Sequence, residues 1–105
     1  MSFEIVKGDL EPDMQLNITV NGAAKDISSA TTYQLRWRKP DGTVSTVALS
    51  AVNLTLGQVR RVWVAGDTDQ VGIHQGQIVV TWAGEPQSFP SDGTYYYWFV
   101  NARLE

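Results

Sequence analysis

Residues 72–100 decide the fold, and they read GIHQGQIVVTWAGEPQSFPSDGTYYYWFV. From Gly72 to Trp82, residues suited to a protein core alternate with glutamine, threonine and valine, which is the period-two pattern of a half-buried β-strand. A loop rich in glycine and proline follows, and the chain returns through the aromatic run Tyr95–Val100. Two such runs joined by a loop predict a β-hairpin.

The first run of this hairpin has one core face. The alternation places His74 on that face together with Gly76, Ile78, Val80 and Trp82. His74 is the only histidine of the chain. We therefore expect a structural histidine inside the core, and no catalytic triad or metal site that needs a second imidazole.

The second run has no polar face. Its two sides are Tyr95, Tyr97 and Phe99 on one and Tyr96, Trp98 and Val100 on the other. A strand that is apolar on both faces has to be covered on both. The pattern predicts the core on one side and a second covering element, such as another protein chain, on the other.

Similar short strands are expected in the rest of the chain. Alternation from Met14 to Asn21 and from Thr32 to Arg38 predicts two half-buried strands, and Asn21-Gly22 and Pro40-Asp41-Gly42 are strong turn signals. Further strands are expected at 3–7, 43–49 and 59–64. About seven short strands with a turn every 8 to 12 residues predict an all-β fold, an immunoglobulin-like antiparallel β-sandwich, as a single domain spanning residues 1–105.

Composition excludes several classes of protein. The 105 residues carry a net charge of −3, and the eight basic residues form no long block, so no nucleic-acid binding is expected. There is no cysteine, which excludes disulfides and thiolate metal sites. No apolar run approaches the ~20 residues of a membrane span, and the N-terminal segment does not resemble a secretion signal. We expect a protein that is made and kept soluble in the cytosol, unless a secretion route without a classical signal is used, and that has no membrane contact.

Two turn regions carry a family resemblance. Residues 37–43 read WRKPDGT and residues 84–93 read GEPQSFPSDG. With Gly72 and Trp82, these segments resemble the Ig-like domain of tailed-bacteriophage structural proteins, such as the N-terminal domain of baseplate upper proteins. His74 departs from the family, which usually has a core tyrosine there. The chain is also shorter than the baseplate proteins.

The resemblance implies a function and a setting. It implies a non-enzymatic virion structural or accessory protein, of the tail, baseplate or head decoration, that binds neighbouring virion subunits. The implied partners are other virion proteins or further copies of this chain, and the implied location is a virion assembled in the host cytoplasm. The alternative is a carbohydrate-binding module that aids host recognition by binding a surface glycan.

The remaining motifs favour ordinary structure over chemistry. Residues 67–69, Asp-Thr-Asp, lack the full spacing of a calcium loop, and Asp9, Glu11 and Asp13 are better explained as a solvated face than as catalytic carboxylates. Asn17-Ile18-Thr19 and Asn53-Leu54-Thr55 are chance glycosylation matches if no secretory route is used. We expect no enzyme activity, no cofactor and no metal.

An interface is the remaining candidate site. Tryptophan, tyrosine and arginine dominate the energetic centres of protein interfaces, and they also stack on sugars. On this basis, the candidate interface residues are Tyr96, Trp98, Trp63, Arg36, Arg38 and Arg60. The sequence leaves open which of them belong to the core instead.

Overall fold

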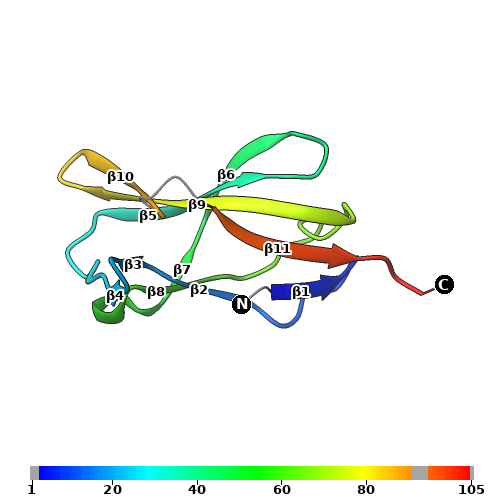
Figure 1. Cartoon of the computed structure of the whole chain (residues 1–105), viewed down its shortest axis with the longest axis horizontal. Helices are drawn as coiled ribbons and strands as arrows, with labels where there is room; N and C mark the ends of the chain where they lie inside the picture. Colours follow the sequence, from blue (N-terminus) through cyan, green and yellow to red (C-terminus); the bar gives the residue numbers. More distant parts are fainter. Residues whose placement is uncertain (1–2, 91–94, 105) are drawn as a thin grey trace.

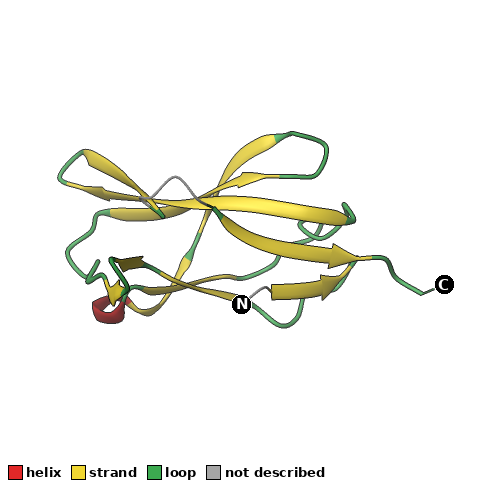
Figure 2. Cartoon of the chain, in the orientation of Figure 1, coloured by secondary structure: helices red, strands yellow, loops and turns green. Residues whose placement is uncertain are grey.

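The computed structural model describes residues 3–90 and 95–104, and their two larger β-sheets face each other (Figures 1 and 2). The larger sheet has the order β1-β11-β9-β5-β6, with β10 also paired to β9, and the smaller sheet has the order β2-β8-β7. The larger sheet contains β1 (Phe3–Val6), β5 (Thr32–Arg38), β6 (Val44–Ala48), β9 (Gly72–Trp82), β10 (Glu85–Phe89) and β11 (Tyr96–Asn101). The smaller sheet contains β2 (Met14–Asn17), β7 (Ser50–Asn53) and β8 (Gln58–Arg61).

The fold class is the predicted one, an all-β immunoglobulin-like sandwich. The described residues contain more strands than the expected seven, because one expected strand is divided and because β7 and β10 lie where no strand was expected. The expected strand from Met14 to Asn21 breaks at Ile18, whose N–H bonds to the Gly57 carbonyl instead of to a strand partner (2.8 Å). The chain between β6 and β7 crosses from the larger sheet to the smaller one at the buried Leu49. β1 and β11 form a parallel pair, in which Phe3 lies opposite Trp98 and Val6 lies opposite Asn101.

Both predicted turns are confirmed. Asn21 and Gly22 have positive φ angles of 52° and 80° and join the short strands β3 (Thr19–Val20) and β4 (Ala23–Ala24). The β5–β6 turn closes with a Lys39 N–H to Thr43 carbonyl bond of 2.9 Å, and Gly42 has a φ of 90°. A single 3-10 turn, η1 (Leu54–Leu56), leads into β8. Within the described residues, no helix is long and apolar enough to cross a membrane.

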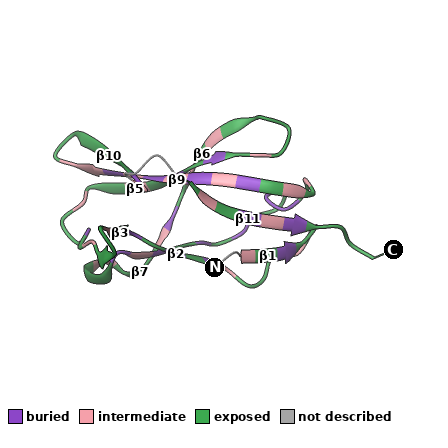
Figure 3. Ribbon diagram, viewed as in Figure 1, coloured by how far each residue is buried: buried purple, intermediate pink, exposed green. Residues whose placement is uncertain are grey.

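The long strand β9 organises the larger sheet. One of its edges pairs with β5, and the other pairs first with β11 and then with β10. Its inward residues His74, Gly76, Ile78 and Val80 are buried, as the alternation predicted, and Figure 3 shows this banding. The Ser91–Gly93 end of the loop used for the phage resemblance lies outside the described residues.

The core fills the space between the two sheets. It is continuous from Ile5 and Met14 to Phe89, and it contains three of the four tryptophans, Trp37, Trp63 and Trp98. Trp37 is the centre of this aromatic group, with ring centroids 5.9 Å from Trp63 and 5.4 Å from Trp98. In the segment after β8, Trp63 is buried while Val62 and Val64 are exposed.

Candidate functional site

His74 is a structural histidine, as predicted. It is fully buried, and Trp37 Nε1 donates a hydrogen bond to its Nδ1 (2.9 Å). An indole N–H can only donate, so Nδ1 must be unprotonated, and the Nε2 hydrogen then points to the Gln70 carbonyl (2.9 Å). Both ring nitrogens are therefore occupied, and burial lowers the pKa of His74 below its ordinary 6.5.

The acidic segments predicted to be ordinary structure are held by arginines. Asp67 is buried, and its Oδ2 accepts from the Arg61 side chain (3.0 and 3.2 Å) and from the Val64 N–H (2.9 Å). Asp13 and Asp9 pair with Arg60 and Arg103. In the described part of the chain, no group of three or more metal-ligating side chains gathers at one place.

The six predicted interface residues do not form one surface. Trp98 and Trp63 lie in the core, so their prediction as contact residues is wrong: both indoles turn toward the space between the sheets. Arg60 belongs to the smaller sheet and pairs with Asp13 at 3.3 Å. Arg36 and Arg38 lie together on the opposite side of the molecule, on the outer face of the larger sheet.

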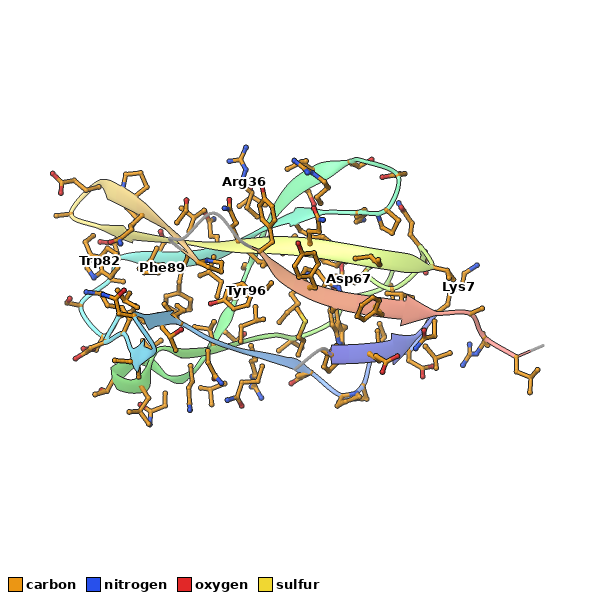
Figure 4. The ribbon with its side chains drawn as sticks, viewed as in Figure 1. Lys7, Arg36, Asp67, Trp82, Phe89 and Tyr96 are labelled. Carbon is orange, nitrogen blue, oxygen red and sulfur yellow. The ribbon has the colours of Figure 1, made fainter. Side chains whose placement is uncertain are left out.

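Tyr96 connects the two sheets. Its ring turns inward from β11, as Figure 4 shows, and its hydroxyl donates to the Asn17 carbonyl at the end of β2 (2.8 Å). Burial raises the pKa of Tyr96 to about 12. The hydroxyl is therefore a neutral donor at physiological pH, and it fixes the spacing between the two strands.

A groove lies where the two sheets face each other along β11 and β2. Its volume is about 950 Å³. One wall comes from β1 and β11 and the other from β2. The lining residues are Phe3, Glu4, Met14, Gln15, Leu16, Asn17, Tyr95, Tyr96, Tyr97 and Phe99.

Strand edges border this groove. β1 pairs with β11 only from Trp98 onward, so within the described residues Tyr96 and Tyr97 have a strand partner on the β9 side alone. β2 pairs with β8 and, among the described strands, with no other. An edge strand with unpaired backbone N–H and C=O groups can accept a further strand.

A second, smaller pocket lies on the outer face of the larger sheet. It has a volume of about 80 Å³, and it is lined by Arg36, Arg38, Val44, Gln75, Gly76, Gln77 and Tyr95. Figure 4 shows Arg36 on the side of this sheet away from β2 and β8. Two of the six predicted interface residues therefore meet at one recess, and Tyr95 lines both this pocket and the groove.

The sequence reasoning missed part of both sites. The strand pattern predicts Met14, Leu16 and Tyr95 only as strand residues, although the doubly apolar run beginning at Tyr95 indicates a covered outer face. The pattern carried no signal for the β2 wall, because Met14 and Leu16 also serve the core. Only the placement of β2 opposite β11 makes them part of a groove.

The fold is similar to that of a solved protein. The crystal structure of CopC from Methylosinus trichosporium OB3b matches with a TM-score of 0.55 and 8% sequence identity, over 99% of this chain and 87% of that one. No family model matches the sequence, and no curated protein does. At this identity, the likeness supports the sandwich fold and nothing finer.

This comparison corrects the predicted function. The matching structure is CopC and not a phage component, so the prediction of a virion structural protein is contradicted. The function therefore has to be argued from the surfaces of this chain.

Proposed function

We propose that this protein is a non-enzymatic binding module that accepts an extended segment of another polypeptide in the groove between β11 and β2. The observation that carries the proposal is the groove itself, which combines aromatic walls with strand edges. Addition of a strand to a sheet edge is a common mode of peptide recognition, in which the backbone supplies affinity and side-chain pockets supply specificity.

The walls favour an apolar segment with alternating side chains. Tyr97 and Phe99 face outward from β11, while Tyr96 faces inward toward Leu16 and Met14 of β2. A strand beside β11 would place alternate side chains against these two sets. Glu4 is the one charged side chain among the described lining residues, so a basic residue in the segment would be favoured over an acidic one.

The groove fits a single strand better than a folded copy of the chain. A free segment is one strand wide, whereas a second copy would bring a whole sheet edge with its hairpin loops. The Tyr96 to Asn17 bond holds the walls at a fixed spacing before any partner arrives. A preformed site of this kind lowers the ordering cost of binding.

A displayed library of random nine-residue peptides tests the proposal. Peptides enriched on the purified protein would be synthesised, and their dissociation constants measured by fluorescence anisotropy. The groove variant is Tyr97→Ser and the control is Val64→Ser, because both residues are exposed apolar side chains (47% and 53%) and Val64 does not line the groove. We expect about tenfold weaker binding for Tyr97→Ser and less than about twofold change for the control.

Two results would overturn the proposal. One is the absence of enriched peptides, or peptides that bind both variants equally. The other is a concentration-dependent dimer in sedimentation velocity that Tyr97→Ser abolishes, since the groove would then be an interface between copies of this chain.

A further inference from the structure

The two arginines of the outer pocket are brought together by strand register. Arg36 and Arg38 are two residues apart on β5, so their side chains leave the same face about 7 Å apart. Trp37 between them turns into the core. Across the sheet, Gln77 of β9 lies opposite Arg36 and Gln75 lies opposite Arg38.

Hydrogen-bond donors dominate the lining of this pocket. Both guanidinium groups are permanently charged, and the amides of Gln75 and Gln77 and the hydroxyl of Tyr95 add neutral donors. No aspartate or glutamate is among the described lining residues. Over residues 3–90 and 95–104, the ion pairs formed by arginines involve Arg60, Arg61 and Arg103. Two neighbouring cations in a net acidic protein therefore form a local positive site.

We infer that this pocket binds a carboxylate group. The guanidinium fork matches the two oxygens of a carboxylate, and such paired hydrogen bonds are stronger than neutral ones. The volume of about 80 Å³ suits a group of a few non-hydrogen atoms and is too small for a nucleotide. Arg36 and Arg38 do not line the groove, so the inference stands independently of the proposed peptide site.

Two sources can supply this group, a free small carboxylate or a carboxylate carried by a polypeptide. Their chemistry at the pocket is the same. Binding of acetate tests the pocket alone, because acetate carries no segment to occupy the groove. Binding of an acetylated dipeptide, compared with its C-terminal amide, tests the polypeptide source.

Side-chain NMR provides the measurement. The arginine Nε–Hε resonances would be followed during titration with sodium acetate at constant ionic strength, with sodium chloride as the reference salt. We expect saturable shifts of Arg36 and Arg38 with a dissociation constant on the order of 1 mM, and no saturable shift in chloride. Arg60, on the other sheet, serves as the internal control.

Variants separate geometry from charge. Arg36→Gln should weaken acetate binding about tenfold, and Arg60→Gln should leave it unchanged. Arg36→Lys keeps the charge but loses the planar fork, so it should also bind acetate more weakly than the unaltered protein does. Tighter binding of the dipeptide acid than of acetate assigns the polypeptide source, and equal binding assigns the small carboxylate. Shifts that are linear in concentration, or alike for chloride and acetate, would overturn the inference.

Discussion

At the scale of single residues, His74 is a polar group that the core engages at both ring nitrogens. His74 stacks on Trp98 with ring centroids 5.7 Å apart and planes at 17°, while Trp37 occupies its Nδ1. Protonation of His74 Nδ1 would place its new N–H group against the N–H group of Trp37. The neutral ring is therefore part of the folded state.

This arrangement predicts a pH-dependent stability. The folded pKa of His74 is lowered, so below about pH 6.5 the unfolded chain binds more protons than the folded one. The stability that the neutral His74 ring contributes is complete above pH 6.5, and it is lost as the pH falls toward and through the pKa of the folded state. Urea unfolding should show that the free energy of unfolding decreases from pH 7.5 to pH 5.5. This decrease should be smaller in His74→Gln than in the unaltered protein. Equal pH dependence of the two proteins would contradict this account.

Gly76 is fixed by close packing. A Cβ atom at this position would lie 2.8 Å from Leu35 Cδ1 and 3.0 Å from the Trp98 ring. Because both neighbours are fully buried, neither can move away easily. We expect Gly76→Ala to lower the free energy of unfolding by about 1–3 kcal/mol. Gln75→Ala, on the outward face next to it, should change it by less than about 0.5 kcal/mol in the same urea titration.

At the scale of the elements, one ion pair secures the crossing between the sheets. Arg61, at the end of β8, donates to the Ala48 carbonyl at the end of β6 (2.9 Å) and binds Asp67 in the following loop. Asp67 also accepts from the Val64 N–H. The pair therefore ties β6, β8 and the 64–67 loop together where the chain changes sheets.

Removing one partner of this pair should be costly. Asp67→Ala leaves the Arg61 charge buried without its counterion, and we expect a loss of about 3–5 kcal/mol in unfolding free energy. The double variant Arg61→Met/Asp67→Ala should recover part of that loss, because no buried charge remains. Chemical denaturation of the four proteins in a double-mutant cycle measures the coupling. A double variant less stable than Asp67→Ala would show that the hydrogen bonds to Ala48 and Val64 dominate instead.

At the scale of the whole molecule, sequence alternation predicted local structure but not the contacts between distant segments. Alternation identified β2, β5, β9 and the inward residues of β9, because a period of two is a local property, and the turn residues identified the two turns. It did not tell which face of β11 is the core, since Trp98 and Tyr97 are both aromatic. The parallel β1–β11 pair, the Arg61–Asp67 bond and the groove wall on β2 depend on contacts between distant segments, which no local pattern encodes. For the same reason, Trp98 and Trp63 were predicted as contact residues.

The aromatic core predicts that both sheets unfold together. Trp63, which follows β8, contacts Phe3 of β1 and Trp37 of β5, with centroids 6.0 and 5.9 Å apart, and Trp37 contacts Trp98 of β11. Trp63 thus loses both of these partners, and Trp37 loses Trp63, if the smaller sheet leaves the larger one. Tryptophan fluorescence and far-ultraviolet circular dichroism should therefore report one coincident transition in urea. Trp63→Phe also removes the bond to the Pro12 carbonyl (2.8 Å), so its midpoint should be lower with the transitions still coincident. Fluorescence that changes at lower urea than circular dichroism would instead mean that the sheets separate before they unfold.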